Sequence, residues 1–161
     1  MRLKTTAAIG LLLIGGSAAV PASASGPNLG VRAARLDKVG PTTWTGKALS
    51  PQLGAGRLTL AGKITFNDTD VDNPNHDTQI IHFRATFKRG WLRGCMVNDT
   101  YLRPGNRQVW DGLGRVTGTS ASLRRYRGLK LGEGGSTPAD DTTYAKPFSF
   151  STTDRPGKPG C

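Results

Sequence analysis

The amino-acid sequence predicts an all-β protein built as a single antiparallel barrel of about eight short strands. In two stretches, 57–66 and 79–87, apolar and polar residues alternate, which is the period of a strand with one buried face. Turn-forming runs rich in Gly, Pro, Asn and Asp separate further short strand-like segments. A closed barrel is favoured because closure leaves no exposed strand edges. An OB-like barrel or a β-sandwich is the alternative.

The N-terminal residues have the pattern of a bacterial secretion signal. Residues 1–4 form a short basic region, and residues 7–19 form an apolar stretch rich in small residues. Ala22-Ser23-Ala24 then fits a signal-peptidase site. The stretch is too short and too rich in Gly and Ala for a transmembrane helix, and no later stretch is long enough. We therefore expect residues 1–24 to be a signal peptide and the mature protein to be secreted and extracellular, with a retained N-terminal anchor as the alternative.

The remaining chain divides into a lead-in, a barrel and a tail. Residues 25–41 show no clear period and are expected to form an extended lead-in, whereas residues 42–151 are expected to form the barrel. The expected strands are 57–66, 79–87, 91–97, 100–102, 108–110, 115–117, 128–131 and 144–151. Residues 152–161 form a turn-rich tail. The chain has two cysteines, and in an exported protein they predict a disulfide between Cys95 and Cys161 that ties the tail back.

The charge of the chain favours anionic partners. Without Arg2 and Lys4 of the leader, 20 of the 22 basic residues remain against 11 acidic ones, which leaves a net charge of +9. Between positions 84 and 127, ten basic residues are opposed by only Asp99 and Asp111, and aromatic residues are interspersed. Basic and aromatic residues together can follow a phosphate backbone, and Arg suits bidentate contacts to phosphate or carboxylate. The alternative is that the aromatic residues face the core and the arginines are simply solvated.

Residues 114–131, GRVTGTSASLRRYRGLKL, hold most of the candidate binding residues. The segment lacks the Gly-Lys-Ser/Thr ending and the following helix of a phosphate-binding loop. Its Thr, Ser and Gly residues instead indicate a link between two barrel strands, with Leu123 reaching into the core. The candidate residues for ligand or polyanion binding are Arg115, Arg124, Arg125, Tyr126 and Arg127 from this segment, and His82.

No complete catalytic motif occurs, so the catalytic residues stay unknown and the question of enzymatic activity stays open. There is no G-x-S-x-G elbow and no Cys/His spacing for zinc, and we expect no cofactor and no metal. His76 and His82 are the only histidines, and a small secreted hydrolase that uses one of them is a weaker alternative.

Residues 68–73 place Asp at alternate positions, as in a calcium-binding loop. However, Asn73 and Gln79 stand where an EF-hand has Gly and a bidentate Glu. Since Asp and Asn are also common turn residues, we expect a solvated hairpin loop here. Calcium binding by Asp68, Asp70 and Asp72 is left open.

Residues 118–128 resemble a hairpin motif of the dirigent and allene oxide cyclase-like barrel superfamily, Gly-Gly-Thr-Gly-x-Phe-x-x-Ala-x-Gly. Gly118 and Gly128 fall in register with the motif, Arg127 stands where the superfamily often has Arg, and Leu123 replaces its aromatic residue. The positions that differ are Thr119, Ser120, Ala121 and Tyr126, in place of Gly, Thr, Gly and Ala. The likeness extends loosely over residues 42–151.

The resemblance implies an eight-stranded barrel whose largely apolar interior holds a small hydrophobic ligand or reactive intermediate. Plant members steer radical coupling or cyclise an epoxide with few catalytic groups, mainly by confining the substrate. We therefore expect a secreted barrel that binds a small hydrophobic molecule and is either non-catalytic or dirigent/cyclase-like. The alternative function is that of a cationic extracellular protein that binds nucleic acid or an acidic wall polymer.

Overall fold

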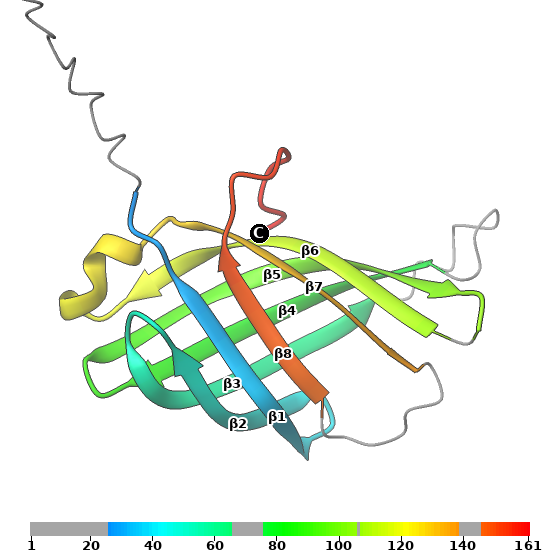
Figure 1. The fold of residues 1–161 in the computed structure, drawn as a ribbon, viewed down its shortest axis with the longest axis horizontal. Coiled ribbons are helices and arrows are strands. Elements are labelled where there is room, and N and C mark those ends of the chain that lie inside the picture. Colours follow the sequence, from blue (N-terminus) through cyan, green and yellow to red (C-terminus); the bar gives the residue numbers. More distant parts are fainter. Residues whose placement is uncertain (1–25, 66–75, 106, 139–145) are drawn as a thin grey trace, which may run out of the picture.

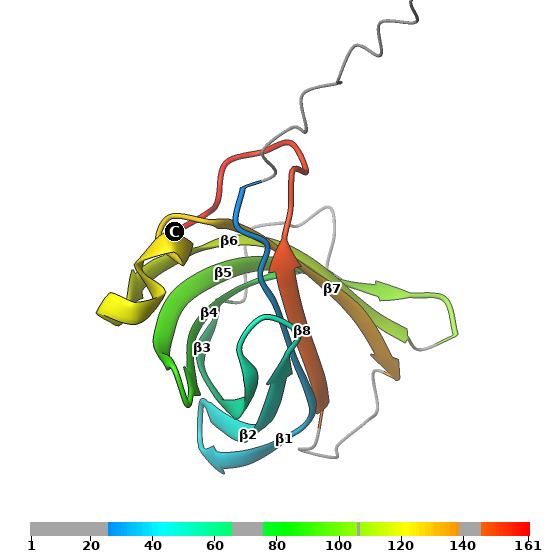
Figure 2. The same ribbon diagram turned by 60° about the vertical axis from the view of Figure 1, so that its left-hand side comes forward.

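The protein folds as one closed antiparallel barrel, which confirms the predicted fold class (Figures 1 and 2). The computed structural model describes residues 26–65, 76–105, 107–138 and 146–161. The strands are β1 (Gly30–Gly40), β2 (Thr43–Ser50), β3 (Gly54–Thr65), β4 (His76–Phe87), β5 (Gly90–Arg103), β6 (Arg107–Thr119), β7 (Lys130–Pro138) and β8 (Lys146–Thr152). Each strand pairs with the next one in the chain, and β8 closes the barrel against β1. Within these ranges no helix is long and apolar enough to cross a membrane.

The segment expected to lead into the barrel provides its first strand, β1. Val31 and Ala33 are buried, but the next buried residue is Leu36, three positions later. The register of β1 against β8 shifts between Ala33 and Leu36, as in a β-bulge. This irregularity breaks the period-two pattern, which is why residues 25–41 do not read as a strand in the sequence.

Strands β5 and β6 are longer than predicted, because each joins two of the expected strands. The pairs Asn98-Asp99 and Asp111-Gly112 were interpreted as breaks or turns between strands, yet both lie within a continuous ladder of β5 and β6. Asn98 is buried and Asp99 is exposed, so the alternation continues through them. The interior of the barrel therefore accepts a polar residue at this level.

Apolar side chains fill much of the barrel interior. The buried hydrophobic residues include Leu58 and Leu60 of β3, Phe83 and Phe87 of β4, Leu92 and Met96 of β5, Val116 of β6, Leu131 of β7, and Phe148 and Phe150 of β8. The ring centroids of Phe83 and Phe150 lie 4.5 Å apart across the interior. This packed cluster is the hydrophobic core of the protein.

The link between β6 and β7 contains a short 3₁₀ helix, η1 (Ala121–Tyr126), which the sequence analysis did not predict. Leu123, on the link, is buried in the core cluster as expected. The link packs on the β4–β5 turn, since the backbone N–H of Trp91 donates a hydrogen bond of 3.1 Å to Oγ of Ser120. A Cβ at Gly90, whose φ is +139°, would overlap that hydroxyl, so this close approach requires glycine.

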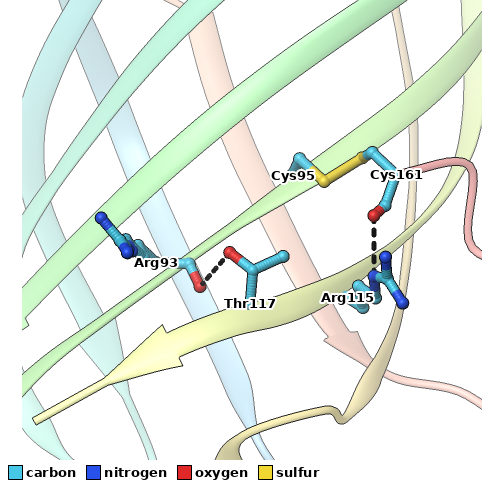
Figure 3. The surroundings of a disulfide bond; sticks show 5 residues. All are labelled: Arg93, Cys95, Arg115, Thr117 and Cys161. Atoms are coloured by element: carbon cyan, nitrogen blue, oxygen red, sulfur yellow. Dashed lines mark hydrogen bonds between the residues drawn. A yellow bond between two sulfur atoms is a disulfide. The ribbon is translucent and has the colours of Figure 1, made fainter.

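The tail after β8 runs along the outside of β6 to β5 and ends in the predicted disulfide. Cys95 on β5 and Cys161 are bonded with their Cα atoms 6.0 Å apart (Figure 3). Arg155 forms a bidentate ion pair with Asp111 on β6. Lys130 donates a hydrogen bond of 2.6 Å to the carbonyl oxygen of Gly157. Both contacts are exposed, so the covalent bond is the main attachment of the tail.

Candidate functional site

Three polar side chains are buried inside the barrel next to one another. Asn98 and Thr100 of β5 and Glu133 of β7 are 1%, 4% and 5% exposed. In the register of the sheet, Gly112 of β6 pairs with Asn98 on one side and with Glu133 on the other. Because glycine has no side chain, nothing separates Asn98 from Glu133 at this level. We call Asn98, Thr100 and Glu133 the polar cluster.

Two glycines make room for the polar cluster and its wall. A Cβ at Gly112 would overlap the side-chain oxygen of Asn98, so the amide lies flat over the backbone of β6. A Cβ at Gly135 would lie 2.5 Å from the ring of Trp110, so the indole lies over the backbone of β7. Trp110 pairs with Thr100 and with Gly135, which places its ring beside the polar cluster.

Several polar atoms of the polar cluster have no hydrogen-bond partner among the described residues. Within the part of the chain that the structure describes, Oδ1 of Asn98, Oγ1 of Thr100 and both carboxyl oxygens of Glu133 are buried without a hydrogen-bond partner. Asn98 and Trp110 lie close enough to Glu133 to lower the pKa of its carboxyl. Neither of them forms a well-aligned hydrogen bond with the carboxyl oxygens. Each such group costs about 1–3 kcal/mol in a folded protein. Buried polar groups are normally paired with protein atoms, ordered water or a bound molecule, so four unpaired atoms in one place call for a partner that the described residues do not supply.

Burial changes the protonation of Glu133. Desolvation raises the pKa of its carboxyl from 4.5 to about 8. Asn98 and Trp110 oppose this rise, and the charge of Asp111 adds a smaller contribution to it. At neutral pH the carboxyl is therefore mostly protonated. It can donate one hydrogen bond and accept another, which an ionised carboxylate cannot do.

The barrel wall is thin beside Glu133. The described pairing of β7 with β8 consists of Leu131 with Thr152, Gly132 with Ser151 and Glu133 with Phe150. Beyond Glu133 the two strands run apart (Figure 2). An open hollow of about 470 Å³ extends over β8 from β7 to β1 and the tail, lined among others by Arg32, Glu133, Gly134, Ser149, Phe150 and Arg155. Glu133 thus belongs both to the polar cluster and to the lining of a surface hollow.

Replacing Gly112 with alanine is expected to destabilise the protein by about 1–3 kcal/mol, because the added methyl group would overlap the buried Asn98 amide and displace it. Thermal unfolding would measure the loss. Gly62→Ala is the matched control, since a Cβ there meets its nearest atom, the carbonyl oxygen of Ile80, at 3.4 Å. Equal stabilities of the two variants would contradict the packing of Asn98 over Gly112.

The residues singled out from the sequence lie elsewhere on the barrel. Arg124, Arg125 and Arg127 are exposed on and just after η1. Tyr126 is only 1% exposed, and its hydroxyl accepts a hydrogen bond of 2.6 Å from Arg125, whose guanidinium also covers the ring. This tyrosine is therefore not available to stack on a nucleobase.

The other two predicted residues, Arg115 and His82, are exposed on the outer wall. Nε of Arg115 donates a hydrogen bond of 2.7 Å to the carbonyl oxygen of Cys161. No described carboxylate forms an ion pair with His82. The side chain of His76 and the acidic residues at 68–72 lie outside the described residues. In the described ranges no group of three or more His, Cys, Asp or Glu side chains gathers as metal ligands would.

Sequence reasoning did not select the residues of the polar cluster. The Gly-Glu-Gly-Gly run at 132–135, which has the composition of a turn, was placed between the expected strands 128–131 and 144–151, although it lies in β7. One feature of the sequence could have drawn attention to this residue: Glu133 is the only glutamate of the chain. Glycines stand on both sides of Glu133 in this run, at 132, 134 and 135.

Comparison of the chain with protein-family models, with curated proteins and with solved structures finds no match. The resemblance to the dirigent and allene oxide cyclase-like superfamily therefore stays a prediction. The residues that carry it span the end of β6, η1 and the glycine that follows.

Proposed function

We propose that the protein is a secreted barrel that binds a small, uncharged and mainly apolar molecule at the polar cluster. The observation that carries this proposal is the set of four buried polar atoms without partners on Asn98, Thr100 and Glu133. A ligand with a hydroxyl or carbonyl group would supply the missing hydrogen bonds, and its apolar remainder would lie against the surrounding apolar and aromatic side chains.

The chemistry of the cluster selects an uncharged ligand. Protonated Glu133 donates a hydrogen bond, Oδ1 of Asn98 accepts one, and the hydroxyl of Thr100 can do either. The buried side chains of the described residues include no basic one. An anionic ligand would therefore be desolvated without a counter-charge, which costs far more than its hydrogen bonds return.

A dirigent- or cyclase-like reaction on the bound molecule would depend on Glu133. Its pKa of about 8 is close to neutrality, so the carboxyl can give or take a proton near pH 7. The remaining contribution would be confinement, which requires no further catalytic group. Loss of turnover with retained binding in Glu133→Gln would distinguish such a reaction from simple binding.

Ligand binding can be tested with the mature secreted protein. Solvent extraction followed by mass spectrometry would identify a bound molecule, and a set of small uncharged alcohols, ketones and phenols would be screened by thermal shift. A ligand at about a hundred times its Kd is expected to stabilise the protein by about 2.7 kcal/mol. Asn98→Ala should weaken this effect, whereas Arg124→Ala on η1 should preserve it. Failure of every compound to raise the Tm, together with an empty extract, would overturn the proposal.

A further inference from the structure

The outer wall of the barrel carries a group of arginines that lies apart from the polar cluster. Arg57 of β3, Arg84 of β4, Arg93 of β5 and Arg115 of β6 are all exposed. Arg84 and Arg93 are direct cross-strand partners. Like charges in such positions normally destabilise a sheet. We call Arg57, Arg84, Arg93 and Arg115 the arginine wall.

No carboxylate of the described residues forms an ion pair with the arginine wall. Where the structure describes the chain, ion pairs join Arg35 with Asp37 and Arg155 with Asp111, and neither involves the arginine wall. The exposed acid nearest to Arg93 along β5 is Asp99, six residues away. Six residues of strand span roughly 20 Å, which is about two Debye lengths at physiological salt. The described carboxylates thus leave this cluster of like charges without an acidic partner.

Neighbouring groups hold several of these arginines in position. The guanidinium carbons of Arg84 and Arg93 lie 4.7 and 5.8 Å from the ring centroid of Trp91, so both cations contact one indole. Figure 3 shows Arg93 and Arg115 on either side of Thr117, with Arg115 fixed by the carbonyl oxygen of Cys161. The bond uses Nε of Arg115 rather than the two terminal nitrogens of this exposed guanidinium. Cations held in this way lose little further entropy when they bind an anion.

A groove runs between the arginines. The β5–β6 register shifts between Arg93 and Gly94, which leaves Thr117 as an extra residue on β6. Beside this bulge lies an open hollow of about 370 Å³, lined by Thr59, Ala61, His82, Arg84, Arg93 and Thr117 among others. Small residues and hydroxyl groups thus form much of its lining, with two arginines at its side.

We propose that the arginine wall binds a linear acidic glycan, a polysaccharide that bears carboxylate or sulfate groups. Arginine matches the planar carboxylate and the sulfate with paired hydrogen bonds, and the threonine hydroxyls of the groove can bond to sugar hydroxyls. A single-stranded nucleic acid would need open aromatic faces for base stacking. Arginines occupy the indole of Trp91 and the ring of Tyr101, and Tyr126 is buried. These features favour a glycan over a nucleic acid.

The test compares two double variants that remove the same charge from the mature protein. Binding to heparin and to polygalacturonate would be measured by calorimetry at 50 and 200 mM salt. Arg84→Ala with Arg93→Ala is expected to weaken glycan binding about tenfold or more. Arg124→Ala with Arg127→Ala, on the link between β6 and β7, is expected to change it less than about threefold. Binding should also weaken as salt rises.

Three results would overturn the proposal: no glycan binding at 50 mM salt, equal losses in the two double variants, or tighter binding of single- or double-stranded DNA than of either glycan. Equal losses would indicate attraction by net charge alone. If the alanine pair does not fold, Arg84→Lys with Arg93→Lys retains the charge and removes the guanidinium fork. This pair should still weaken binding more than Arg124→Lys with Arg127→Lys does.

Discussion

Replacing Glu133 with glutamine is expected to flatten the dependence of stability on pH between about 4.5 and 8. The pKa of the buried carboxyl is about 8 in the folded protein, against 4.5 for the free group. Across this window the folded state keeps its proton and the unfolded state releases it. The free energy of unfolding is therefore fully retained below pH 4.5 and falls as the pH rises toward 8. At about 1.4 kcal/mol per pKa unit, the total loss is on the order of 4 to 5 kcal/mol.

Thermal unfolding of the wild type and of Glu133→Gln at pH 5, 7 and 9 would measure this effect. Glutamine cannot ionise, so the two proteins should differ least at pH 5. At pH 9 the variant should have the higher Tm, by on the order of 10 °C. Asp154→Asn, which removes an exposed carboxylate, should leave the pH dependence of the wild type in place. A difference between wild type and Glu133→Gln that stays constant with pH would contradict the burial of an ionisable carboxyl.

The strands that the sequence predicted best are those with regular alternation. The stretch 79–87 lies within β4 and the described part of 57–66 lies within β3, and buried residues at 58, 60, 83, 85 and 87 alternate there with exposed or half-buried ones. The alternation in β1 is interrupted by a bulge, and a bulge is set by how the neighbouring strands pair. Local pattern therefore identified the fold class but not every strand.

The places where sequence reasoning failed coincide with the candidate site. Asn98-Asp99, Asp111-Gly112 and the run at 132–135 all have the composition of turns, and all three lie inside strands. The register aligns them in one row, with Gly112 between Asn98 and Glu133. Residues that oppose strand formation are tolerated there because the glycine makes room for the polar side chains. Conflict between local preference and fold is expected at functional sites.

The arginine wall shows a second limit of sequence reasoning. The excess of basic residues between positions 84 and 127 is visible in the sequence, and it directed attention to Arg124, Arg125 and Arg127 because they are close in the chain. Only the cross-strand register shows that Arg84 stands opposite Arg93. Sequence proximity is a poor guide to charge density on a barrel, because neighbouring strands bring distant residues together.

Removing the disulfide is expected to lower the free energy of unfolding by about 4 kcal/mol, because the bond closes a loop that spans 66 residues. Cys95→Ala with Cys161→Ala, compared with the wild type by guanidinium denaturation, would measure this loss. The exposed contacts of the tail, such as the pair of Arg155 with Asp111, are too weak to replace the bond. A loss of less than about 1 kcal/mol would contradict the stabilising role of the disulfide.

The same double variant separates the two proposed sites. Without the bond the carbonyl oxygen of Cys161 no longer orients Arg115, so glycan binding to the arginine wall should weaken. Asn98, Thr100 and Glu133 are buried inside the barrel, so ligand binding in the interior of the folded variant should persist. Parallel loss of both activities would mean that the tail supports the whole barrel. Loss of glycan binding alone would place the effect of the disulfide on the outer wall.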